Sequence, residues 1–230
     1  MKKLYEGKAK ILFEKGKNIV QYFKDDTTAF NGERFEIKEG KGVLNNAISS
    51  FFMENLEKNS VATHFLEKLD ERHQLVKKVK IIPLEVIIRN VTAGSFCKKF
   101  GVERGKTLPF PLVEFSLKDD SLGDPLIPET HIFALKIATE DEISQIKEMA
   151  LKVNTFLQSQ FEKIELLLVD FKIEFGRHGK KIILADEISP DSCRLWQKGT
   201  LESFDKDLFR EQKGEIVEAY REIARRLGIL

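Results

Sequence analysis

Hydrophobic residues recur at two spacings along the chain, and the change between them separates a strand-rich first third from a helix-rich remainder. Short alternating or continuous apolar runs predict strands at residues 8–14, 18–24, 64–69, 75–79 and 84–89. Lys15-Gly16-Lys17 is a hairpin signal between the first two, and Pro83 marks a break before the last. Apolar residues at helical spacing predict helices over residues 44–56, 139–161 and 216–227, with a Thr139/Glu142 capping box on the second.

The most informative stretch covers residues 168–176, where charged and apolar residues alternate after a short apolar run at 166–169. In an extended chain Asp170, Lys172 and Glu174 share one face, and the intervening apolar residues share the other. His178-Gly179 predicts a hairpin turn, so Glu174 and Asp186 bracket a hairpin and are expected to meet at its open end. Two carboxylates there suit Mg²⁺, a hard cation that prefers oxygen ligands. A surface ladder of salt bridges is the alternative.

This hairpin shares its layout with protein kinases, which place an Asp, a Lys two residues later and a metal-binding Asp after a hairpin. The comparison is geometric, since Asp186 is followed by Glu187-Ile188 and the kinase Asp-Phe-Gly is absent.

Bulk composition bounds the class of protein. The 230 residues are 42% hydrophobic and 33% charged, which is typical of a globular protein with a sizeable core. A net charge of +1 argues against a nucleic-acid protein held by a general basic field. Cys97 and Cys193 fit no metal spacing and are expected to be reduced thiols in a cytoplasmic protein. We expect no signal peptide and no contact with membranes, because no segment approaches the roughly 20 apolar residues of a membrane span.

The order of elements predicts an α+β fold with two packed lobes. Residues 1–80 are expected to form a mostly antiparallel, β-rich N-terminal lobe, and residues 81–230 a mixed α+β lobe. The cleft between the lobes is the default place for a ligand.

Two segments could bind anions through glycine and cationic side chains. Gly7 stands beside Lys8 and Lys10, which share a face if the segment is extended; it lacks the spacing of a Walker A loop. Solvated lysines on an exposed strand are the alternative. Arg89 to Ser95 links an apolar strand to a short helical pattern, where Ser95 can contact a phosphate, cap the helix, or do both.

A third segment, residues 189–196, carries Arg194, which can clamp a carboxylate or phosphate with two parallel hydrogen bonds. Acids at Asp186, Glu187, Asp191 and Asp205 are expected to surround it. Trp196 is interpreted as core packing and Cys193 as a buried thiol without a catalytic partner.

Other polar residues show no such pattern. The histidines (His64, His73, His131 and His178) lack metal spacing and are interpreted as structural or surface residues. Residues 25–32 predict a turn, and residues 118–125 an exposed loop.

Taken together, six motifs in order are more specific than any one alone. They are Tyr5-x-Gly7-Lys8-Ala9-Lys10, residues 23–32, Lys41-Gly42-x-x-Asn45-Asn46, residues 86–95, residues 168–176 and Asp186-Glu187-Ile188-Ser189-Pro190-Asp191-x-x-Arg194-Leu195-Trp196. The chain closely resembles the family of phosphoribosylaminoimidazole-succinocarboxamide synthases, or SAICAR synthetases. The resemblance spans essentially the whole chain and matches the single-function bacterial type.

The resemblance implies an ATP-dependent C–N ligase of de novo purine biosynthesis. L-Aspartate and carboxyaminoimidazole ribonucleotide (CAIR) give SAICAR, ADP and phosphate, through an acyl phosphate on the CAIR carboxylate. It also implies a kinase-like or ATP-grasp-like nucleotide site between the lobes, Mg²⁺ and a homodimer.

The same resemblance implies the following roles for individual residues of this chain. Glu174 and Asp186 hold Mg²⁺, Lys172 neutralises charge at the reacting carboxylate, and Asp170 orders substrate or metal. The nucleotide is held by Lys8, Ala9, Lys10, Lys118 and the backbone of Lys80, Ile81 and Ile82. CAIR is held by Arg89, Ser95 and Arg194, with Asp124 and Asp191 ordering substrate or metal. Lys41 and Asn45 are candidates for the aspartate site.

Two other functions remain open at this point. A small-molecule kinase on a similar fold would release a stable phosphorylated product without needing aspartate. A non-catalytic nucleotide-sensing module could use the same lysines but would not need both Glu174 and Asp186.

Overall fold

Antiparallel sheets organise the computed structural model, which describes residues 1–29 and 34–230. In the first sheet the strands lie in the order β1-β2-β3-β7-β6, formed by β1 (Lys2–Glu6), β2 (Lys10–Lys15), β3 (Asn18–Phe23), β6 (Phe65–Lys68) and β7 (His73–Lys77). Gly16, with a φ of 61°, makes the predicted turn between β2 and β3. A separate pair, β4 (Asp26–Ala29) and β5 (Arg34–Ile37), follows.

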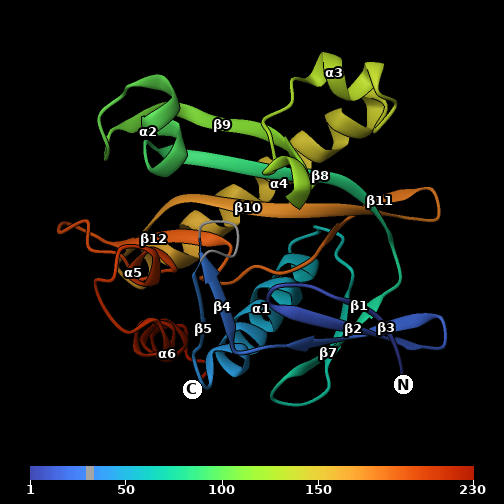
Figure 1. Ribbon diagram of the computed structural model, residues 1–230, viewed down its shortest axis with the longest axis horizontal. Coiled ribbons are helices and arrows are strands. Elements are labelled where there is room, and N and C mark those ends of the chain that lie inside the picture. Colours follow the sequence, from blue (N-terminus) through green and yellow to red (C-terminus); the bar gives the residue numbers. More distant parts are fainter. Residues whose placement is uncertain (30–33) are drawn as a thin grey trace.

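The second sheet has the order β11-β10-β8-β9, with β12 also paired to β10. Its strands are β8 (Lys80–Val91), β9 (Thr107–Leu117), β10 (Leu166–His178), β11 (Lys181–Ala185) and β12 (Cys193–Gln197). The predicted short strand at 166–169 and the alternating stretch after it are one continuous strand, β10. In Figure 1 this sheet crosses the upper half of the molecule and the first sheet lies at the lower right.

Helices pack on these sheets and join them. They are α1 (Lys41–Lys58), α2 (Gly94–Phe100), α3 (Glu129–Ala134), α4 (Glu140–Glu162), α5 (Asp207–Arg210) and α6 (Ile216–Arg226), with a 3-10 turn η2 at Asp120–Leu122. Helix α4 begins at the predicted capping box of Thr139 and Glu142 and packs against β10 and β8. Helix α1 packs against α6 and the first sheet.

One hydrophobic cluster runs through both halves of the chain. It contains Phe52 from α1, Val86 from β8, Ile173 from β10, Leu157 from α4 and Ile223 from α6, each nearly inaccessible to solvent. The α+β fold is therefore confirmed. The break between the sheets, after β7 and before β8, coincides with the predicted boundary at residue 80, although the shared core keeps the division into lobes a prediction.

Some local expectations were wrong. Strand β8 runs through Pro83, which lies where the β10–β8 ladder is irregular between Glu174 and Gly176, so the missing N–H costs little. Residues 26–29 form strand β4 instead of a turn, because Thr27 and Thr28 pair with β5. Phe30, Asn31 and Gly32 of that motif lie outside the described residues.

None of the helices in the described ranges, 1–29 and 34–230, is long and apolar enough to cross a membrane.

Candidate active site

The hairpin of β10 and β11 places two carboxylates together. Glu174 pairs in register with Ala185, the last residue of β11, and Asp186 follows directly. The turn uses Gly179, with a φ of 60°, as the sequence predicted. Glu174 is 2% exposed, while the side chain of Asp186 is 25% exposed. The two carboxylates of β10, Asp170 and Glu174, are buried, so the alternative of a solvated surface ladder does not describe them.

Lysines from other elements neutralise these carboxylates. Lys10, the first residue of β2, forms an ion pair with Asp186, and its Nζ lies 2.7 Å from Glu187 Oε1. Lys118, just after β9, forms an ion pair with Glu174. The pair of acids is thus contacted by one lysine from the first sheet and by one that follows β9 of the second sheet.

Burial and the neighbouring charges shift the pKa values of Glu174, Asp186 and Lys10. Burial raises the pKa of Glu174, and the neighbouring Asp186 raises it further, against the opposing effect of Lys118. Burial also works to raise the pKa of Asp186, but Lys10 and Lys118 outweigh it and hold that pKa well below its usual range. Burial works to lower the pKa of Lys10, and Asp186 and Glu187 raise it above its usual value. Lys10 and Asp186 are therefore both charged at neutral pH.

Lys172 lies on the same face of β10, between Asp170 and Glu174, and forms an ion pair with Glu85 of β8. Burial works to lower the pKa of Lys172, but Glu85 and Glu174 raise it overall. Its side chain is still 38% exposed, so an ammonium group held by a fixed carboxylate remains accessible to a ligand.

Asp170 joins two arginines from segments that lie far apart in the sequence. Arg89 Nη1 donates to Asp170 Oδ2 at 3.1 Å, and Arg194 Nη1 donates to the same oxygen at 2.5 Å. Strand pairing explains the meeting, because Asp170 is in register with Arg89 on β8 and with Arg194 on β12. Arg89 Nε also donates to Glu114 Oε2 at 2.5 Å.

Arg194 is further fixed by Asp207, the first residue of α5, whose Oδ2 accepts from Arg194 Nε at 2.6 Å. Its remaining guanidinium nitrogen lies against Gly94, the first residue of α2: a Cβ added there would sit 2.7 Å from Arg194 Nη2. Gly94 also has a φ of 54°, in the region that favours glycine. Ser95 follows as an exposed residue of the first turn. The expectation that Ser95 caps this helix was wrong, because the helix begins one residue earlier and Ala93 is the N-cap.

Asp191 and Lys41 come together in the interior. Lys41 Nζ lies 2.5 Å from Asp191 Oδ2, and the Tyr220 hydroxyl donates to Asp191 Oδ1 at 2.7 Å. Lys41 is fully buried, and Asn45, one helical turn later, is 1% exposed. Burial works to raise the pKa of Asp191, but Lys41 lowers it overall. This cluster ties α1 and α6 to the loop before β12.

The glycine–lysine segment forms the turn between β1 and β2. Gly7 N donates to Lys10 O at 2.8 Å, and Ala9 O accepts from Lys24 N at 2.8 Å. Lys8 is exposed and lies 2.6 Å from Asp120 Oδ1. Residues 7–9 bend between the two strands, so the extended segment that would put Lys8 and Lys10 on one face does not form, and the two lysines contact different acids.

Lys80, Ile81 and Ile82 open strand β8. They pair with β10 near Gly176 and Arg177, whereas the ladder with β9 begins only at Leu84 and Leu117. The segment thus extends past the end of β9. Asp124 lies in the predicted loop after β9, where its Oδ1 accepts from Asp119 N at 3.0 Å.

The interpretations of Trp196 and Cys193 agree with the structure, since both are buried and burial raises the pKa of the thiol.

Within residues 1–29 and 34–230, no cluster of three or more His, Cys, Asp or Glu side chains is arranged to hold a metal ion. Glu174 and Asp186 still fit Mg²⁺, which commonly takes only one or two protein carboxylates and completes its shell with water and phosphate oxygens. Both carboxylates carry cationic partners that compensate their charge in the same place.

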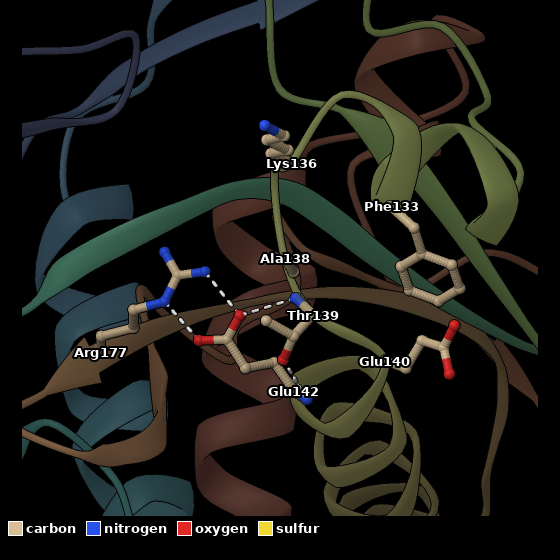
Figure 2. Close-up of a pocket in the computed structure, with 7 residues that line it drawn as sticks. All are labelled: Phe133, Lys136, Ala138, Thr139, Glu140, Glu142 and Arg177. Atoms are coloured by element: carbon tan, nitrogen blue, oxygen red, sulfur yellow. Dashed lines mark hydrogen bonds and ion pairs between the residues drawn. The ribbon is translucent and has the colours of Figure 1, made fainter.

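A surface hollow of about 220 Å³ lies elsewhere, where β10 ends near the start of α4. Figure 2 shows Arg177 reaching across to Glu142, with Thr139 beside it and Phe133 on the far side. None of the predicted site residues lines this hollow.

Several residues that hold the site escaped the sequence analysis. Glu85, Glu114 and Asp207 fix Lys172, Arg89 and Arg194 respectively. Glu85 and Glu114 are each the only acid in their strand and have apolar neighbours on both sides, which is a usable signal. Asp207 lies in an acidic stretch without a distinctive pattern.

Comparison with known proteins gives consistent matches. The sequence profile of SAICAR synthetase matches residues 3–227. The chain is 53% identical to phosphoribosylaminoimidazole-succinocarboxamide synthase of Lachnoclostridium phytofermentans, over 100% of this chain and 98% of that one. The crystal structure of the synthase from Ehrlichia chaffeensis superposes with a TM-score of 0.97 at 45% identity, covering 100% and 99% of the chains. A SAICAR synthetase in complex with ADP gives a TM-score of 0.94 at 45% identity, covering 97% and 96%.

Proposed function

The chain belongs to the SAICAR synthetase family, and from this premise we propose which of its residues carry each part of the reaction. The protein is an ATP-dependent ligase that condenses L-aspartate with CAIR to give SAICAR, ADP and phosphate in purine biosynthesis. The residue roles that follow are proposals.

The observation that carries the assignment is the lysine-capped pair of Glu174 and Asp186. Mg²⁺, when bound, supplies a divalent charge that neutralises phosphate oxygens and draws the carboxylates as ligands. With the acids engaged by the metal, Lys10 and Lys118, which pair with those acids here, would be free to bind phosphate oxygens. Burying two neighbouring carboxylates carries a desolvation cost, which a bound cation would help to offset.

Nucleotide binding uses the segments that border this pair. Lys8 and Ala9 belong to the turn before Lys10, so their backbone and side chains can cover the phosphates. The Lys80–Ile82 segment extends beyond β9, which supports the proposal that its backbone meets the adenine edge. Lys8 and Ala9 directly precede Lys10, which pairs with Asp186, and Lys80 and Ile81 pair with β10 at Arg177 and Gly176, just beyond Glu174.

CAIR binding uses the arginine cluster. Arg89 and Arg194 both donate to Asp170, so their guanidinium planes are fixed before the substrate arrives. A guanidinium has five N–H donors, and Arg194 uses only Nε and Nη1 in the contacts with Asp170 and Asp207. We propose that the other donors, with Ser95, bind the CAIR phosphate. Asp124 and Asp191 are proposed to order substrate or metal.

The chemistry needs the CAIR carboxylate to gain a leaving group. Transfer of the γ-phosphoryl group to a carboxylate oxygen makes an acyl phosphate and releases ADP. The aspartate amine then attacks the acyl carbon, the new C–N bond forms, and the C–O bond to phosphate breaks with loss of the amine proton. Lys172, held by Glu85, lies between the metal pair and the arginine cluster and offsets negative charge on the reacting carboxylate.

Lys41 and Asn45 are less suited to the aspartate site, because both are buried and Lys41 already pairs with Asp191. We propose instead that Lys41 and Asn45 help to hold Asp191 in place. We also propose a homodimer, on the family resemblance alone, and a cytoplasmic location, in keeping with two free cysteines.

Release of ADP from ATP and Mg²⁺ tests the reaction. ADP and a succinocarboxamide product should form only when CAIR and L-aspartate are both present. ADP released with CAIR alone and no product from aspartate would contradict the ligase assignment and favour a kinase.

A further inference from the structure

Asp186 has an unusual backbone for the residue that carries the site's second carboxylate. Its φ is 62°, in the left-handed region that non-glycine residues seldom adopt. It follows β11 directly, so this conformation sets the direction in which the chain and the carboxylate leave the sheet. Such a conformation persists when surrounding contacts hold it.

His64 supplies a contact to that backbone from the other half of the chain. Its Nε2 lies 2.9 Å from the carbonyl oxygen of Asp186, and the residue is 4% exposed. A carbonyl only accepts, so Nε2 carries the hydrogen and donates it. Burial lowers the pKa of His64 to about 4, which leaves the ring neutral under ordinary conditions.

The backbone of His64 is fixed on both sides. His64 N donates to Leu184 O at 2.8 Å, and Leu184 N donates to Ala62 O at 2.9 Å, so residues 62–64 run alongside β11 as a short parallel bridge. Lys77 N donates to His64 O at 2.6 Å, which ties the residue to β7 of the first sheet. The backbone of His64 is therefore hydrogen-bonded to both sheets, and its ring contacts the residue that directly follows β11.

We propose that His64 is a positioning residue for Asp186: its Nε2–H holds the Asp186 carbonyl and so keeps the left-handed backbone that directs the carboxylate toward Lys10 and Glu174. This rests on the proposed role of Asp186 in holding Mg²⁺. His64 directly precedes β6 and is hydrogen-bonded to β7 of the first sheet, so the same contact makes the placement of Asp186 depend on how the two sheets pack together.

Two variants of similar polarity separate this role from simple packing. In His64→Gln the amide nitrogen reaches about as far as Nε2, whereas in His64→Asn it reaches only about as far as Nδ1. The measurement is ADP binding by calorimetry, with and without Mg²⁺, on the full chain. We expect His64→Asn to raise the Mg²⁺ concentration needed for half-maximal enhancement of ADP binding by about 10-fold or more, and His64→Gln by less than about 3-fold. Metal-free ADP binding should change by less than about 2-fold in both.

Asp186→Asn, measured in parallel, distinguishes the two claims. If Asp186→Asn abolishes the Mg²⁺ enhancement while His64→Asn and His64→Gln behave alike, the positioning role is wrong and the metal assignment stands. If Asp186→Asn keeps the enhancement, the metal assignment itself fails. An equal loss of metal-free binding in His64→Asn would likewise overturn the proposal, because it would indicate general damage to the nucleotide site.

Discussion

Gly94 lies directly against the guanidinium of Arg194, so closely that a Cβ on Gly94 would stand 2.7 Å from Arg194 Nη2. The contact joins the start of α2 to β12, and it forms beside the Asp170 carboxylate that holds Arg194 and Arg89 together. A single absent methyl group thus leaves room for one of the two arginines proposed to bind CAIR.

Gly94→Ala should displace Arg194 and strain a residue whose φ is 54°. We expect the KM for CAIR to rise by about 10-fold or more while kcat changes less, because binding of the substrate phosphate is affected more than the reacting carboxylate. Gly101→Ala is the matched control. Gly101 ends the same helix with a φ of 64°, but a Cβ added to it would meet no atom within 4 Å, so only stability should fall. Equal CAIR titrations for the two variants would contradict the role of the contact.

Arg194→Lys should raise the CAIR requirement strongly, because a planar fork that donates to Asp170 and Asp207 becomes a single point charge. Steady-state titration of CAIR at saturating ATP and aspartate measures the effect. Arg177→Lys serves as the control, since Arg177 makes a comparable double contact with Glu142 away from the predicted site. A CAIR titration unchanged in Arg194→Lys would remove Arg194 from the site.

The protonation of Asp205 should make the free energy of unfolding depend on pH. It is fully buried beside Asp207, and burial with that neighbouring charge raises the pKa of Asp205 to about 7. The folded state therefore holds a proton that the unfolded chain releases near pH 4, so this stabilisation is present at low pH and is lost as pH rises from about 4 through about 7. At about 1.4 kcal/mol per pKa unit the upper limit is about 4 kcal/mol.

Denaturant unfolding of the wild type and Asp205→Asn at several pH values measures this contribution. The free energy of unfolding of the wild type should fall relative to the variant as pH rises through that window. A constant difference between the two proteins would show that Asp205 does not titrate there.

Thr139→Ala should destabilise the protein without affecting the reaction. Thr139 Oγ1 accepts from Glu142 N at 3.2 Å, and Glu142 Oε2 accepts from Thr139 N at 2.9 Å, which completes the capping box of α4. Loss of such a cap costs about 1 kcal/mol. Thr155→Ala, in the exposed interior of the same helix, should be neutral or slightly stabilising. Thermal unfolding of both variants is the measurement, and equal melting temperatures would contradict the prediction.

Sequence alone predicted the parts of the site that are local. The alternation along residues 168–176 and the turn at Gly179 placed Glu174 and Asp186 together, because strand period and turn chemistry act over a few residues. The capping box was found for the same reason. The family resemblance, carried by motifs spread over the chain, supplied the reaction.

Long-range contacts could not be predicted this way. His64 meets Asp186 and Lys118 meets Glu174 only after the sheets have formed and packed. The expected turn was wrong at residues 26–29 for a related reason. The aspartates and threonines there favour turns locally, yet pairing with β5 and the contact of Asp25 with Arg72 stabilise an extended chain. The break expected at Pro83 was wrong for the same reason. The irregular pairing that accommodates the proline is made with β10, which is distant in the sequence.

The turnover of Glu174→Gln tests the central claim most directly, namely that the lysine-capped carboxylates of Glu174 and Asp186 form the nucleotide–metal site. Gln keeps the shape of Glu174 but removes the charge that Lys118 and Mg²⁺ would share. We expect turnover to fall by about 100-fold or more with the fold retained, while Glu129→Gln, which only loses an exposed pair with Lys147, stays near wild type. Near-normal turnover of Glu174→Gln would contradict the assignment.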